Sequence, residues 1–159
     1  MGFTIINSLD EFNEAINTQN NNLVIAYFTA SWCGPCKVIS PIVKNIGEHN
    51  DHISVLKIDV DECEEVSSHC NIQCMPTFNF YRNCNLEPCD TMSGADKQKL
   101  LTTIENILND MERENTQQEQ GQVQGQVQGQ YGHHDNSIYN QEYDNINEKI
   151  HNMTFNQNF

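Results

Sequence analysis

The pentapeptide Trp32-Cys33-Gly34-Pro35-Cys36 separates two segments with different patterns of apolar residues. The run Leu23–Phe28 before it is continuously apolar, which is typical of a strand buried on both faces of a sheet. After it, residues Cys33–His49 predict a helix that is kinked at Pro41. The expected apolar positions of that helix are Val38, Ile39, Ile42, Val43 and Ile46. A strand and a helix that are joined by a short segment with two cysteines indicate an α/β domain whose chemistry depends on sulfur.

Each residue of the Cys-x-x-Cys motif suits a site at a helix N-terminus. Unpaired N–H groups and the helix dipole favour an anion there, so we expect the pKa of the Cys33 thiol to be lowered. Cys36 lies one turn further along and is expected to be more buried, within reach of Cys33 for a short-loop disulfide. Gly34 and Pro35 suit a first helical turn, where a missing N–H costs nothing. The motif therefore indicates reversible thiol–disulfide chemistry.

The main alternative for such a motif is one half of a zinc site, with Cys70 and Cys74 as the other half. However, Cys70 ends a predicted helix and Cys74 precedes a predicted strand, so neither has to face the first pair. Pro35 also stiffens the loop that would wrap the metal. We therefore expect no metal and no bound cofactor, only a redox-active Cys33–Cys36 disulfide.

Strand and helix patterns alternate along residues 1–110. Ser8 and Glu11 form a capping box that opens the first helix. The predicted strands are Phe3–Ile6, Leu23–Phe28, Ile53–Val60, Thr77–Tyr81 and Leu86–Met92. The predicted helices are Ser8–Asn17, Cys33–His49, Glu62–His69 and Asp96–Asp110. This order predicts a mixed sheet with helices on both faces.

Composition narrows the class of protein and its location. The chain of 159 residues has a formal net charge of −14, which argues against binding nucleic-acid phosphates or an anionic membrane surface. Its N-terminus lacks the pattern of a signal peptide, and its apolar runs are too short to span a bilayer, so we expect a cytoplasmic protein. Seven cysteines are an odd number, so at least one thiol is free or pairs outside the chain.

The composition changes near residue 110. Residues 111–159 are rich in Gln and Asn and contain a short Gly-Gln-Val-Gln repeat. Such a segment cannot bury enough apolar surface to offset the entropy of ordering it. We therefore expect one folded domain over residues 1–110 and a disordered tail over residues 111–159.

Residues 3–110 resemble the thioredoxin family, and the cytosolic animal type in particular. The resemblance rests on WCGPCK followed by Pro41, and on the segments Lys57–Asp61, Met75–Phe78 and Ser93–Ala95, in that order. It implies a thioredoxin fold, in which helices cover both faces of a central mixed β-sheet. It also implies a dithiol–disulfide oxidoreductase that reduces protein disulfides.

The resemblance assigns a role to each matching residue. Cys33 is expected to be the nucleophile and Cys36 the resolving thiol. Pro76 matches the cis-proline of the family, beside which the backbone of Met75 would pair with an extended substrate. Expected supporting residues are Trp32, Gly34, Pro35 and Lys57, and expected substrate-binding residues are Met75, Pro76 and Gly94.

The resemblance also implies partners. They are an NADPH-dependent thioredoxin reductase and disulfide-containing clients such as peroxiredoxins and ribonucleotide reductase, in electron transport and cell redox homeostasis. We expect a monomer, with a disulfide-linked dimer as the alternative state.

One position in the expected site departs from the family pattern. Thioredoxins usually carry a buried aspartate six residues before the first cysteine, paired with a lysine that corresponds to Lys57. Tyr27 occupies the aspartate position here. A phenol with an ordinary pKa near 10 is not a base at neutral pH. We therefore predict an active protein in which Cys36 reacts more slowly.

The remaining cysteines have two interpretations. Cys63, Cys70 and Cys74 are either small, partly buried apolar residues or regulatory thiols, with Cys74 near the substrate rim. Cys84 and Cys89 lie in the segment Asn83–Met92, which is longer than in typical animal thioredoxins. We expect these two to be free surface thiols, with a bond between them as the alternative.

Two other functions remain open from the sequence. A disulfide oxidase or isomerase would favour histidine at Pro35 and a secretory location. A redox-dependent protein-binding module with weak or modified reductase activity would keep the domain and use the tail for additional contacts.

Overall fold

The computed structural model describes residues 2–19 and 22–120. Its contacts divide the chain into two units, Met1–Lys97 and Gln98–Phe159. The first unit contains a five-stranded sheet in the order β1-β3-β2-β4-β5, in which β4 runs antiparallel to the other four strands. The strands are β1 Phe3–Ile5, β2 Leu23–Thr29, β3 Ile53–Asp59, β4 Thr77–Tyr81 and β5 Asp90–Ser93. The predicted mixed sheet is confirmed.

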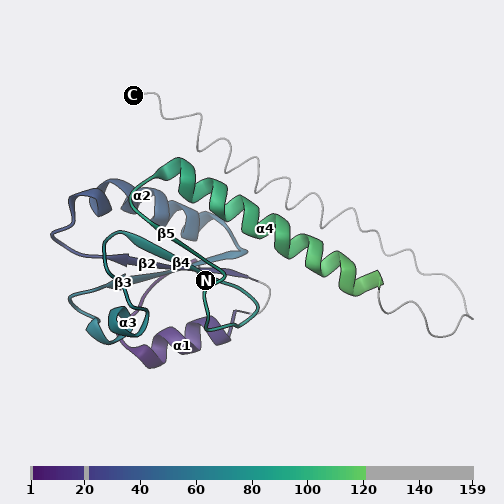
Figure 1. Cartoon of the computed structure of the whole chain (residues 1–159), viewed down its shortest axis with the longest axis horizontal. Helices are drawn as coiled ribbons and strands as arrows, with labels where there is room; N and C mark the ends of the chain where they lie inside the picture. The colour runs from purple at the N-terminus through teal and green to yellow at the C-terminus, as the bar shows by residue number, and fades with distance from the viewer. Residues whose placement is uncertain (1, 20–21, 121–159) are drawn as a thin grey trace, which may run out of the picture. The chain divides into compact units, whose positions relative to one another are not determined.

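Helices of the first unit cover both faces of the sheet. α2 (Gly34–His49) lies over one face, and α1 (Leu9–Asn17) and α3 (Glu64–His69) lie over the other (Figure 1). The predicted capping of α1 is confirmed, because the Ser8 side chain accepts a hydrogen bond from the Glu11 N–H at 3.2 Å. The carboxylate of Glu11 accepts from the N–H of Asn7.

The central strand β2 is buried throughout, as its apolar run predicts. Alternate side chains serve opposite faces. Val24, Ala26 and Phe28 join the core with α1 and α3. Tyr27 points to the other face, where its hydroxyl contacts α2. The strand therefore links the core to the helix that carries the cysteines.

The inward face of α2 differs from the prediction at one residue. Ile39, Val43 and Ile46 are buried, but Val38 is 72% exposed. Positions 39, 43 and 46 share one side of an α-helix, and residue 38 is turned away from them by about 100°.

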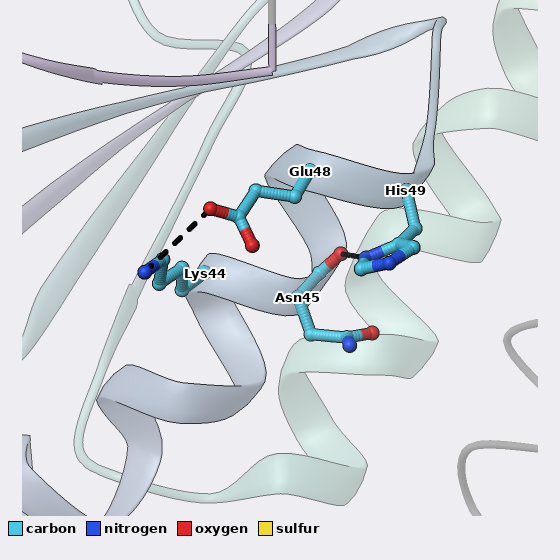
Figure 2. Close-up of polar contacts among 4 residues, drawn as sticks. All are labelled: Lys44, Asn45, Glu48 and His49. Carbon is cyan, nitrogen blue, oxygen red and sulfur yellow. Dashed lines mark hydrogen bonds and ion pairs between the residues drawn. The ribbon is translucent and has the colours of Figure 1, made fainter.

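At the other end of α2, Lys44 pairs with Glu48 at 3.6 Å, and His49 Nδ1 lies 3.1 Å from the Asn45 carbonyl oxygen (Figure 2). These exposed contacts add little to stability.

The last strand was predicted over Leu86–Met92. Its predicted start is wrong, because β5 begins at Asp90. The preceding residues form a turn in which Asn83 and Cys84 have φ values of 57° and 53°, and the Asn85 N–H bonds to the Arg82 carbonyl. Pro88 has no N–H to donate to a sheet. Pairing with β4 resumes only where the Cys89 N–H reaches the Phe80 carbonyl at 2.7 Å.

The last helix, α4, spans Lys97–Gln120 and so continues ten residues past the predicted end at Asp110. Residues 111–120 contain good helix formers and neither glycine nor proline, so a change to polar composition does not end the helix. Met111 is buried. The division into a domain over 1–110 and a disordered tail over 111–159 stays a prediction, and residues 121–159 lie outside those described.

Candidate active site

The two cysteines of the motif lie where β2 passes into α2. Cys33 is the N-cap residue of α2, and its Sγ accepts a hydrogen bond from the Cys36 N–H at 3.2 Å. Cys33 and Cys36 form a disulfide with their Cα atoms 5.3 Å apart. Both are buried, at 4% and 1% exposure, while Gly34 and Pro35 are exposed between them. The structure thus holds the oxidised form of a dithiol at a helix N-terminus.

Trp32 lies on the surface directly before Cys33. Its side chain is 65% exposed, and its Nε1–H donates to Asp61 Oδ2 at 2.8 Å. Asp61 follows β3, the strand parallel to β2, and its own N–H bonds to Asp59 Oδ1. The role of Asp61 was not predicted. The sequence feature that could have indicated this role is an acidic residue at the carboxyl end of a strand next to the strand that precedes the motif.

A second loop reaches the dithiol from the start of β4. The Met75–Pro76 peptide bond is cis, which confirms the proline expectation. Met75 packs against the cluster of Ala30, Cys33 and Cys36. The hydrogen bonds found among residues 2–19 and 22–120 include none from the Met75 backbone. Its N–H and carbonyl are thus available to an extended ligand.

Gly94 is connected to this loop through the backbone. Its N–H donates to the Pro76 carbonyl at 2.9 Å, and its φ of +96° lies in the left-handed region. An L side chain rarely adopts that conformation. The structure therefore brings Met75, Pro76 and Gly94 together beside the cysteines.

Tyr27 lies beneath the dithiol. It is 1% exposed, and its ring stacks on Phe78 with centroids 5.1 Å apart. The hydroxyl lies 3.2 Å from the Cys36 carbonyl oxygen, 2.6 Å from Ser40 Oγ and 3.3 Å from Thr29 Oγ1. Ser40 was another residue missed from the sequence, because its link to Tyr27 spans 13 positions.

Lys57 lies opposite Tyr27 in the β2–β3 register and is half-buried. Within the described ranges, no carboxylate lies within 4.0 Å of its amine. The lysine of the family pattern is therefore present, but it has no acidic partner in the part of the chain that the structure describes.

The other five cysteines are free thiols in different environments. Cys63 is buried, Cys70 and Cys84 are half-buried, and Cys74 and Cys89 are exposed. The alternative bond between Cys84 and Cys89 is absent from the structure. Cys74 immediately precedes Met75 in the chain, and its placement near the substrate rim stays a prediction.

Burial raises the pKa of two of these thiols. Desolvation raises the pKa of Cys70, and a hydrogen bond to the Tyr81 hydroxyl 3.8 Å away partly opposes this. Desolvation also raises the pKa of Cys89, partly opposed by the positive charge of Arg82. Both thiols therefore stay protonated to a higher pH than an ordinary cysteine.

Neither a metal cluster nor a membrane span is found in the part of the chain that the structure describes. No group of three or more His, Cys, Asp or Glu side chains there is arranged to hold a metal ion. No described helix is long and apolar enough to cross a membrane.

Comparison with known proteins assigns the family. The thioredoxin family model matches residues 3–106. The chain belongs to the thioredoxin family. It is 40% identical over 103 residues to thioredoxin of Equus caballus, covering 65% of this chain and 96% of the relative. It is 45% identical over 101 residues to thioredoxin of Ictalurus punctatus, covering 62% and 92%.

Solved thioredoxin structures agree with this assignment. That of Plasmodium falciparum thioredoxin is 40% identical, with a TM-score of 0.59 and coverage of 65% of this chain and 97% of that one. The predicted thioredoxin fold is thus confirmed. Thioredoxins are dithiol–disulfide oxidoreductases that need no cofactor besides a redox-active disulfide, and Cys33–Cys36 is that disulfide here.

Proposed function

We propose that this protein is a protein-disulfide reductase in which Cys33 is the nucleophile and Cys36 the resolving thiol. The observation that supports these roles is the Cys36 N–H directed at Cys33 Sγ, at the N-terminus of α2. In the reduced protein, that donor and the helix dipole favour the Cys33 thiolate. Cys36 is inside the helix and more deeply buried, so it meets a client only through Cys33.

The reaction consists of two exchanges of sulfur bonds. The Cys33 thiolate attacks one sulfur of a client disulfide, and the other client sulfur leaves as a thiolate. Cys36 then loses its proton and attacks Cys33 Sγ, and the second client sulfur leaves as a thiolate. The client has gained two electrons, and the protein has become the Cys33–Cys36 disulfide.

Client binding is proposed for the loops around the dithiol. The free N–H and carbonyl of Met75 would pair with an extended client segment beside Pro76, in the manner of an added strand. Trp32 and Gly94 would form the rim on which the client rests. Gly34 and Pro35 are exposed next to Cys33, and a Cβ on Gly34 would meet no atom within 4 Å. Lys57 would contribute a positive charge on the strand beside Tyr27.

We further propose recycling by an NADPH-dependent thioredoxin reductase, and a role in electron transport and redox homeostasis of the cytoplasm. Peroxiredoxins and ribonucleotide reductase are proposed clients. A structural relative with 27% identity and a TM-score of 0.59 comes from work on how a yeast mitochondrial 1-Cys peroxiredoxin is resolved through glutathione and thioredoxin systems. We propose a monomer, with exposed Cys74 as the residue that would link a dimer.

Oxidation of NADPH, coupled through a thioredoxin reductase to insulin reduction, tests the proposed activity. Cys33→Ser should abolish turnover. Cys36→Ser should also abolish it and accumulate a mixed disulfide between Cys33 and the client. Cys74→Ser, which removes an exposed thiol that takes no part in either exchange, is the matched control and should keep the full rate.

Two outcomes would count against the reductase. Full turnover by Cys33→Ser would exclude the proposed nucleophile. Partner capture by Cys33→Ser, with no turnover by the unsubstituted protein, would favour the binding module. A chain ending at Gln120 should match the full chain, because every proposed site residue precedes Lys97.

A further inference from the structure

The hydroxyl of Tyr27 contacts two successive turns of the helix that carries the resolving thiol. It lies 3.2 Å from the Cys36 carbonyl oxygen in the first turn of α2 and 2.6 Å from Ser40 Oγ in the next turn. Tyr27 itself belongs to β2, at the centre of the sheet. A residue of the central strand is thus bonded to the segment that positions Cys36.

The available hydroxyl protons determine which groups donate and which accept in this contact. Tyr27 has one hydroxyl proton, and the Cys36 carbonyl oxygen can only accept. When Tyr27 donates to that carbonyl, Ser40 becomes the donor of the short bond to the tyrosine oxygen, and the Thr29 hydroxyl 3.3 Å away donates to the same oxygen. This arrangement gives each of the four groups a partner. Leaving one of them without a partner would cost free energy, because the site is buried.

The segment next to the contact has one helical bond fewer than usual. Pro41 lies inside α2 and has no N–H, so the Lys37 carbonyl lacks its usual donor four residues later. Ser40, the residue before this proline, is disfavoured in helical conformation by the proline ring. The turn that holds Cys36 therefore receives less support from its own helix, and a bond from the sheet can hold it in place.

Tyr27 is well placed to supply that support. It is 1% exposed, and its ring is stacked on Phe78 at an interplanar angle of 11°. β3 and β4 both pair with its strand at this residue, opposite Lys57 and Phe78. The Tyr27 side chain is therefore held in one position, and its hydroxyl can orient α2.

We propose that Tyr27, together with Ser40, is a positioning pair for the resolving cysteine. The pair holds the first two turns of α2 so that Cys36 stays behind Cys33 Sγ while a client is attached to Cys33. This inference rests on the proposed reductase function, and it concerns only the second exchange. The pair does not contact the client, so attack by Cys33 does not depend on it.

Separate measurement of the two exchanges tests the positioning pair. The reduced full-length protein is mixed with a disulfide-containing peptide and quenched with acid at intervals. The mixed disulfide on Cys33 is then quantified by mass spectrometry after digestion. Tyr27→Phe should leave its rate of formation unchanged. Its decay should slow by about fivefold, the rate equivalent of one lost hydrogen bond of about 1 kcal/mol.

Ser40 provides a second, less buried position. Ser40→Ala should also slow the decay, and Ser40→Thr should restore it because threonine keeps the hydroxyl. The double variant Tyr27→Phe/Ser40→Ala should be no slower than Tyr27→Phe alone, since both changes remove the same network.

Tyr81→Phe is the matched control. It also removes a buried tyrosine hydroxyl, but this one contacts Asn79 and Cys70 and not α2. Its mixed disulfide should form and decay at the rates of the unsubstituted protein. A decay in Tyr27→Phe that is unchanged, or that slows only as much as in Tyr81→Phe, would overturn the inference. If the unsubstituted protein forms no mixed disulfide on Cys33, the reductase function is overturned and the inference with it.

Discussion

Gly94 and Gly34 both lie near the dithiol, but only Gly94 needs to be glycine for conformational reasons. Gly94 has a φ of +96°, whereas Gly34 has no left-handed φ and a Cβ there would meet no atom within 4 Å. A side chain at Gly94 would find space too, so the cost there comes from the backbone alone.

Gly94→Ala should therefore destabilise the protein by about 1–2 kcal/mol, the cost of a left-handed conformation for an L residue. Urea denaturation followed by circular dichroism would measure it. Gly34→Ala is the control and should change the free energy of unfolding by less than about 0.5 kcal/mol. Equal effects of the two substitutions would contradict the backbone explanation.

The residues of the site differ in how much of their role a sequence reveals. Cys33 and Cys36 are recognisable because motif, strand and helix are all local. Asp61 and Ser40 are not, since each contributes through a partner 29 or 13 positions away that becomes a neighbour only in the fold. Tyr27 is visible only as a departure from a family pattern. Its hydrogen bonds to two turns of α2 can be seen only in the structure.

At the level of elements, the turn between β4 and β5 has an unusual conformation. Asn83 and Cys84 both have positive φ. Asparagine tolerates the left-handed region, because its side chain can bond locally, but cysteine has no such compensation. Cys84 therefore places strain in this turn.

Cys84→Gly should stabilise the protein by about 0.5–1 kcal/mol, because relief of the left-handed strain exceeds the added entropy of the unfolded chain. Asn83→Gly is the matched control and should be close to neutral. Chemical denaturation of both variants would measure the difference. A destabilised Cys84→Gly would show that packing of this half-buried side chain outweighs its backbone strain.

Elements that are buried on every side were predicted most accurately. All seven residues of β2 are buried, so its apolar run has one interpretation. β5 has one buried residue among four, and its start was misplaced because Leu86 is apolar but exposed. The end of α4 was misplaced for a different reason. A polar segment buries few of its side chains, but a helix made of good helix formers can continue without burying them.

For the whole molecule, ionisation of buried groups decides how stability changes in alkaline solution. The net charge of −14 comes from carboxylates that are already ionised at neutral pH. Thiols and phenols are among the groups that titrate in alkaline solution. Burial raises the pKa of Cys70, Cys89 and Tyr81 in the folded protein.

These shifts predict that the free energy of unfolding falls as the pH rises above about 8.5. In the unfolded chain, thiols titrate near 8.5 and tyrosine near 10, whereas the folded chain keeps these three groups protonated to higher pH. The unfolded state then binds fewer protons than the folded state, so stability decreases with pH. Below about pH 8 both states hold the protons, and these groups make stability independent of pH.

Urea denaturation of the oxidised protein between pH 7 and 10.5, under argon, would measure this loss. The closed Cys33–Cys36 disulfide keeps the active-site thiols from contributing. Cys70→Ser/Cys89→Ser is the matched variant, and its stability should fall less steeply between pH 8.5 and 9.5 because its serine hydroxyls do not titrate there. A free energy of unfolding that is constant to pH 10, or an equal slope in the variant, would show that these two thiols ionise alike in the folded and unfolded chains.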